Sequence, residues 1–217
     1  MKKRILSILL MCCMVLTLLP VTALAEDSAY TVGEDTGVSA RALAGTAGTK
    51  LKADNIATYI ANGLGGGVYT LAEDVTISGT LRVTGEATVD LNGHILRYAE
   101  EAEPDSIFRV TSGSTLTLTD SRPEAEHEDK TLPAGGLITG GRGYIYYGGG
   151  VYVETGASFM LAGGTIYACG VQSGANQAFG GGIYADGGSV TMSGGAIRNC
   201  AVSGDYGASG GAIYAKA

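Results

Sequence analysis

The fold of this chain is decided by a repeat whose first copy reads GGGVYVETGASFMLAGGTIYACG, residues 148–170. A second copy, GGGIYADGGSVTMSGGAIRNCA, occupies 180–201, and a third begins as GGAIYAKA at 210–217. Equivalent residues of the first two copies lie 31 or 32 positions apart along the chain. A period near 30 residues is typical of proteins built by stacking one structural unit on the next.

Each repeat contains three short apolar runs, which in the second copy read GIYA, SVTMS and AIRNC. Runs of this length with alternating side chains predict β-strands, and the glycines between them favour tight corners. Three strands per repeat predict a triangular coil, with the next coil about 4.8 Å further along the stack. The inward side chains of this copy are expected to be Ile183, Ala185, Val190, Met192, Ile197 and Cys200. Because one coil buries so few apolar groups, coils must stack to be stable.

The same alternation runs upstream from Val68, in VYTL, VTIS, TLRV, ATVDL, SIFRV, STLTLTD and GLIT. We therefore predict an all-β domain of about five coils over residues 64–217. A single helix is predicted just before it, at 51–63, where apolar residues recur at helical spacing. Asp54 is expected to cap the start of this helix, and Asn62-Gly63 is expected to end it.

The repeat, together with LAEDVTISGT, VDLNGH and SGSTLTLTD upstream of it, resembles the right-handed parallel β-helix repeats of large bacterial surface proteins. It is also distantly similar to the GGAI-type repeats of chlamydial polymorphic membrane proteins. The resemblance implies a right-handed parallel β-helix, a solenoid, whose N-terminal end is covered by the helix at 51–63. Proteins of this kind include adhesins, passenger stalks and polysaccharide-active enzymes, so the fold alone does not select a function.

The first 25 residues have the organisation of a signal peptide. Three cationic residues at 2–4 precede an apolar run at 5–19, and Ala23-Leu24-Ala25 supplies the pattern for cleavage after Ala25. An uncleaved membrane anchor is the alternative, although an apolar run of this length is shorter than the roughly 20 residues that span a bilayer. The sequence thus predicts a secreted or cell-surface protein, with a flexible linker at 26–50 and no membrane insertion of the mature chain.

The net charge of the chain argues against two classes of binding partner. The formal net charge is −7, from 14 Lys and Arg against 21 Asp and Glu. Removing the three cations of the signal peptide leaves 11 against 21, or −10. A chain this acidic repels nucleic acid and anionic lipid, so neither is an expected partner.

Two cysteines remain after cleavage, Cys169 and Cys200, at equivalent positions of the repeat. Neighbouring coils would place their Cα atoms at disulfide distance, yet side chains stacked in register point in parallel and favour separate thiols. We predict two free, largely buried thiols, with a disulfide as the alternative.

Candidate chemistry is sparse. His94 follows Asp90-Leu91-Asn92-Gly93, which is interpreted as a corner with the histidine on the outer face; an Asp90–His94 acid–base pair is the alternative. Acidic stretches at 100–105 and 124–129 are interpreted as solvated loops, or else as a loose cation site or ligand-contact loops. We predict no catalytic residue, metal site or cofactor.

The tyrosines of the repeat are the candidate binding residues. With Val151, Ile183 and Ile213 buried and in register, their neighbours Tyr152, Tyr184 and Tyr214 are expected to face outward and stack. One interpretation is an aromatic ladder that stabilises the stack. The other is a platform for sugar rings, helped by further tyrosines on the preceding coil: Tyr144, Tyr146 and Tyr147.

The sequence therefore predicts a non-enzymatic structural or adhesive module that contacts polysaccharide or the surface of host or neighbouring cells. The runner-up is a carbohydrate-active or glycan-binding protein of the pectate-lyase-like class, and the third is a passive stalk that spaces another domain. The chain stops at Ala217 inside its third repeat. We therefore expect a truncated β-helix, monomeric but with an aggregation-prone open end.

Overall fold

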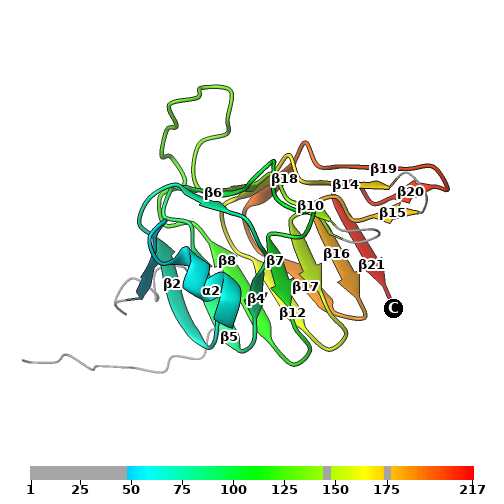
Figure 1. Ribbon diagram of the computed structural model, residues 1–217, viewed down its shortest axis with the longest axis horizontal. Coiled ribbons are helices and arrows are strands. Elements are labelled where there is room, and N and C mark those ends of the chain that lie inside the picture. Colours follow the sequence, from blue (N-terminus) through cyan, green and yellow to red (C-terminus); the bar gives the residue numbers. More distant parts are fainter. Residues whose placement is uncertain (1–47, 144–147, 174–176) are drawn as a thin grey trace, which may run out of the picture. The chain divides into compact units, whose positions relative to one another are not determined.

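The computed structural model describes residues 48–143, 148–173 and 177–217 (Figure 1). The predicted signal peptide, nearly all of the predicted linker, and Tyr144, Tyr146 and Tyr147 lie outside the described residues. The described residues belong to one compact unit, Val38–Ala217. Among them, one segment is helical and the rest of the regular structure is strand, which confirms the predicted all-β class.

Every pair of neighbouring strands within a sheet runs parallel, and the three main sheets are named here A, B and C. Sheet A contains β1 (Thr49–Leu51), β2 (Gly67–Leu71), β5 (Glu86–Asp90), β8 (Thr115–Thr119), β12 (Ser158–Leu161) and β17 (Ser189–Met192). Sheet B contains β4 (Leu81–Val83), β7 (Phe108–Val110), β11 (Val151–Val153), β16 (Ile183–Asp186) and β21 (Ile213–Lys216). Sheet C contains β3 (Val75–Ile77), β6 (Ile95–Tyr98), β9 (Leu137–Thr139), β13 (Thr165–Tyr167) and β18 (Ala196–Arg198).

From β2 onward the chain visits the three sheets in a fixed cycle: A, then C, then B. Each strand consequently pairs with the strand that occupies the same place in the next cycle. Each of the three sheets therefore gains one strand per cycle (Figure 1). The apolar side chains of all three sheets meet in one buried cluster, which includes Leu81, Leu118 and Ile166.

The register of the repeat is the predicted one. Ile183 pairs with Val151 on one side and with Ile213 on the other. Val151 and Ile183 are fully buried, but the expectation that Ile213 is buried is wrong, since its exposed fraction is 36%. The physical reason is its place: β21 is the last strand of sheet B and has a neighbour on one side only. Met192, predicted to face inward, is 45% exposed at the corresponding end of sheet A.

The helix α2 (Ile56–Asn62) lies within the predicted segment 51–63 but is shorter, since Leu51 belongs to β1. Its end is confirmed at Gly63, whose φ of 83° suits glycine. The start differs from the prediction, because Asn55 rather than Asp54 occupies the cap position. The Asn55 carboxamide is fixed by the preceding turn: it accepts from the Lys52 N–H at 2.9 Å and donates to the Lys50 carbonyl at 2.8 Å. The predicted linker also ends early, since β1 begins at Thr49 and pairs with β2.

The later repeats carry more than the three predicted strands. Sheet D contains β10 (Arg142–Gly143), β14 (Gly170–Ser173) and β19 (Ala201–Gly204), and sheet E contains β15 (Ala178–Phe179) and β20 (Ala208–Ser209). These residues are mostly small or polar and lack a strong apolar alternation, so the sequence pattern did not predict them as strands. Pairing with the equivalent segment one repeat later supplies the hydrogen bonds that make them strands.

Candidate functional site

An unbroken row of large side chains crosses the outer face of sheet B. The parallel register brings one residue from each strand into line, in the order Arg82, Arg109, Tyr152, Tyr184 and Tyr214. Their neighbours along each strand, such as Leu81 and Val83, belong to the buried cluster, which fixes the direction of the row. We call these five residues the sheet B ladder.

The three predicted tyrosines do lie in register on one face, but Tyr184 is not the exposed residue that was expected. Only 2% of its surface is accessible, and it lies outside the central apolar cluster. Its ring is covered on both sides by the tyrosines of the ladder and approached by Phe179, at 6.4 Å between ring centroids. Burial here therefore comes from neighbouring coils and from β15, not from the core.

The rings of the ladder face one another along the stack. Tyr184 and Tyr214 are parallel to within 3°, with centroids 5.6 Å apart, and Tyr152 lies 5.6 Å from Tyr184 at a tilt of 44°. Phe179 approaches Tyr214 at 4.5 Å. Aromatic faces that are occupied by other rings contribute to the stability of the stack, which favours the stabilising interpretation of the ladder. A sugar approaching this face would meet ring edges and phenol groups.

The ladder changes from aromatic to cationic at Arg109. The guanidinium carbon of Arg109 lies 5.1 Å from the centre of the Tyr152 ring, within range of a cation–π interaction. Its Nε donates to Glu154 Oε1 at 2.6 Å, and the other oxygen of this carboxylate accepts from the Ser112 N–H. Arg82 is the next residue of the ladder and is exposed.

Cys169 and Cys200 are free thiols, as predicted, with Cys169 buried and Cys200 half-buried. The Ala201 N–H donates to the Cys169 carbonyl at 3.1 Å, so the two residues lie on adjacent coils. The neighbouring Cys200 thiol, together with burial, raises the pKa of Cys169 well above its usual value. The neighbouring Cys169 thiol lowers the pKa of Cys200, which makes Cys200 the more readily ionised thiol.

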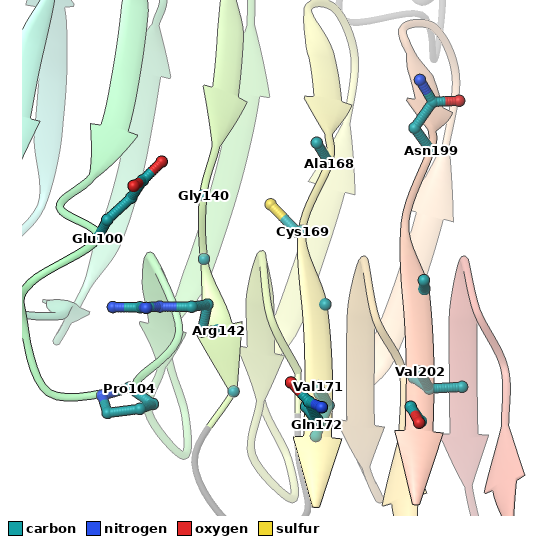
Figure 2. Close-up of a pocket in the computed structure, with 15 residues that line it drawn as sticks. Glu100, Pro104, Gly140, Arg142, Ala168, Cys169, Val171, Gln172, Asn199 and Val202 are labelled. Carbon is teal, nitrogen blue, oxygen red and sulfur yellow. The ribbon is translucent and has the colours of Figure 1, made fainter.

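A groove of about 920 Å³ opens beside this cysteine pair (Figure 2). Its lining comes from sheet D and from the loop that contains Glu100 and Pro104. Figure 2 shows the Arg142 side chain reaching from β10 toward that loop, where Nη2 donates to the Ala99 and Ala102 carbonyls at 3.1 and 2.8 Å. The Arg142 Nε is buried and has no hydrogen-bond partner among the described residues.

The groove was not predicted from the sequence, because its floor is made of the unpredicted strands of sheet D. The one sequence signal was Arg142 itself, a cation placed between glycines where the repeat otherwise has small residues. The polar residues of the groove's lining, which include Gln172 and Asn199, suit hydrogen bonding to a ligand. The volume of the groove also lies within the range of ligand pockets.

Asn92 and Gly93 form the predicted corner before His94, both with positive φ. Asp90 does not pair with His94: its Oδ1 accepts from the N–H groups of Asn92 and Ser121, both at 2.9 Å. The Nδ1 of His94 instead lies 3.3 Å from Oδ1 of Asp74, a carboxylate whose side chain is 60% exposed. The alternative acid–base pair of Asp90 with His94 is therefore not formed.

The two acidic stretches lie in loops, as predicted. The second belongs to a long segment between β8 and β9 that projects from sheets A and C (Figure 1). Its base is held by Asp120, which accepts from the Gly93 N–H at 2.7 Å and from the Gly136 N–H at 2.6 Å. Within the loop, Glu126 pairs with Lys130. Among the described residues, no group of three or more His, Cys, Asp or Glu side chains is placed to share a metal ion.

Within the described part of the chain, no helix combines the length and apolar character needed to cross a membrane. Comparisons with models of protein families, with curated proteins and with solved structures find no match for this chain.

Proposed function

We propose that residues 64–217 form a right-handed parallel β-helix that serves as a structural and adhesive module of a secreted or cell-surface protein. The proposal is supported by the cycle of strands through sheets A, C and B and by the parallel register within each sheet. A stack of coils of this kind is rigid along its length, and its outer faces repeat at each coil.

The observation that carries the adhesive role is the sheet B ladder, an outer row of side chains in register. The ladder provides a continuous outer row of five large side chains, of which Tyr152 and Tyr214 are half-buried and Arg82 is exposed. The loops at 99–105 and 120–136 are tied down at their bases by Arg142 and Asp120. A row of side chains repeated along a parallel sheet is suited to binding an extended surface polymer, and the two anchored loops, at the corner before sheet B and at the corner between sheets A and C, add ordered surface elsewhere on the domain.

The test is the binding of the purified, secreted full-length chain to a glycan array and to whole cells. We expect selective retention on a subset of polysaccharides or cell types. Retention on none of them would contradict the adhesive role and favour a passive stalk. Release of shortened oligosaccharides from a bound polymer would overturn the non-enzymatic assignment in favour of a carbohydrate-active protein.

Export is tested separately, by N-terminal sequencing of the protein recovered from the medium or the cell surface. We expect the mature chain to begin at Glu26, directly after the predicted cleavage position. Recovery of the chain only inside the cell, with an intact N-terminus, would contradict export.

A further inference from the structure

Two arginines stand side by side at one end of the sheet B ladder. Arg82 and Arg109 are register partners on the adjacent parallel strands β4 and β7. Neighbouring strands are about 4.8 Å apart, and like charges on directly opposite positions destabilise a sheet. Such a pair is unexpected in a chain with a net charge of −7.

The carboxylate near this pair neutralises only one of its members. Glu154 binds the Arg109 Nε and the Ser112 N–H, so its two oxygens serve Arg109 and the following backbone. Arg82 forms no ion pair with any of the described residues and is exposed. The pair therefore carries a local surplus of positive charge that an anionic group can complement.

We propose that Arg82, Arg109 and the edge of Tyr152 bind a polysaccharide that carries isolated acidic groups, either carboxylate or sulfate. The proposal rests on the adhesive function proposed above and names the class of ligand for that face. The acidic group is held by the two guanidinium groups, which are the donors best matched to it. The ring edge and phenol group of Tyr152 meet the hydroxyls of the adjoining sugar.

The charge and spacing of the site select this ligand over other polyanions. The strongly acidic chain repels a polymer with one charge on every unit, whereas a polymer with sparse acidic groups carries less charge toward it. Side chains on one face of an extended peptide recur about every 6.6 Å, so a peptide whose single carboxylate meets the two arginines has no second side chain on that face within one rung, about 4.8 Å, to reach Tyr152. A sugar chain laid along the ladder presents hydroxyls at closer intervals than a peptide presents side chains.

The experiment measures binding of the full secreted chain to hyaluronan oligosaccharides, in which every second sugar carries a carboxylate. Neutral N-acetylchitooligosaccharides of the same length test the need for charge. A DNA oligomer and an acidic peptide test the two other classes of polyanion. We expect hyaluronan to bind, with affinity falling as salt is raised, and the neutral oligosaccharide and DNA to bind at least tenfold more weakly.

Arg82→Gln is the decisive variant, because its side chain is exposed and its loss removes no described ion pair. We expect about a fivefold loss of hyaluronan affinity, the size of one partly exposed charged contact. The matched control is Arg97→Gln. Arg97 is also exposed, and it lies between two buried residues of β6, a strand of sheet C that has a neighbour on each side. The control should bind as the parent does, and neither variant should melt below the parent, since Arg82→Gln removes a like-charge pair.

The outcomes distinguish failure of the Arg82–Arg109 site from failure of the proposed adhesive function. Equal losses in Arg82→Gln and Arg97→Gln, or no loss in either, would overturn the site while leaving adhesion through another face. Tighter binding of the acidic peptide than of hyaluronan would overturn the ligand class. Absence of binding to every glycan and every cell type would overturn the adhesive function itself.

Discussion

At the scale of single residues, the corner between sheets C and D is the clearest case of stored strain. Three successive coils place Gly140, Ala168 and Asn199 at the same corner, all with positive φ. Glycine adopts this conformation freely, asparagine tolerates it, and an alanine there costs roughly 1 kcal/mol. The repeat therefore uses three residue types for one conformation, and only one of them is strained.

We predict that Ala168→Asn raises the stability of the protein, by about 0.5–1 kcal/mol. The Ala168 side chain is exposed, so the larger residue has room, and its φ of 48° is close to that of Asn199 at 55°. Differential scanning calorimetry should show an increase in melting temperature of about 2–3 °C. The reciprocal variant Asn199→Ala should lower it, and a lower melting temperature for Ala168→Asn would contradict the strain argument.

Asp120 is the second residue whose role is predicted from its bonds. Its carboxylate is 8% exposed and accepts from the backbone of Gly93, Arg122 and Gly136. Asp120→Ala leaves buried N–H groups unpaired, for which we expect a loss of about 2–4 kcal/mol in urea unfolding. Asp129→Ala in the same loop is the control, and it should unfold at the parent's urea midpoint because Asp129 is exposed. Similar values for the two variants would show that Asp120 does not anchor the loop.

At the scale of elements, the loop at 99–105 depends on an arginine about 40 residues later in the sequence. Arg142 donates to the Ala99 and Ala102 carbonyls from Nη2 and to the Asp105 carbonyl from its backbone N–H. Tyr98 adds a bond to the Glu103 carbonyl, and burial followed by the nearby Asp105 charge raises the pKa of this phenol. The loop forms one wall of the groove, so its order also fixes the shape of the groove.

We expect Arg142→Gln to release this loop, because the shorter amide cannot reach both carbonyls. A glutamate-specific protease should then cleave after Glu100 or Glu101 several times faster than in the parent protein. Arg122→Gln, an exposed substitution in the other long loop, is the control. Unchanged cleavage at these sites in Arg142→Gln would show that Tyr98 and the remaining backbone bonds hold the loop without the guanidinium.

The position of a strand within its sheet decides how much an isoleucine side chain contributes to the stability of the protein. Ile183 on β16 has a neighbour on both sides and is fully buried, whereas Ile213 on the final strand is 36% exposed. We expect Ile183→Ala to cost about 3 kcal/mol and Ile213→Ala less than about 1 kcal/mol. Denaturant unfolding of the two variants measures the difference. Equal costs would show that another surface covers the final strand in solution.

At the scale of the whole domain, stability should be graded along the stack. Strands β17, β18 and β21 are the terminal strands of their sheets, and their side chains are half-buried or exposed. The strands β8, β9 and β7 lie inside the same sheets with neighbours on both sides. Contacts between equivalent strands of successive cycles dominate the packing, so unfolding can begin at the terminal coil.

Hydrogen exchange followed by mass spectrometry tests this gradient. We predict that amides in 189–217 exchange at least ten times faster than amides in 108–119, because the terminal strands open without the rest. Uniform protection across both segments would instead indicate a single cooperative unit, or a partner that covers the terminal coil.

The sequence by itself determined the strand class, the period and the register. The repeat specified that Val151 pairs with Ile183, 32 positions later, and the Asn62-Gly63 pair located the end of the helix. These features are local or strictly periodic, because alternation and corner glycines act on the backbone over a few residues. The free state of Cys169 and Cys200 also followed from their equal repeat positions.

Only the tertiary structure decided what covers each side chain. Tyr184 is buried through Phe179 and the tyrosines of neighbouring coils, and Arg82 meets Arg109 because two strands of unequal sequence pair in one register. Sheet D, and with it the groove beside Arg142, arises from pairing between segments that have no strand pattern of their own. The physical reason is that burial, charge environment and the pairing of weakly patterned segments depend on neighbours from other cycles of strands, whereas alternation and corner glycines act over a few residues of one segment.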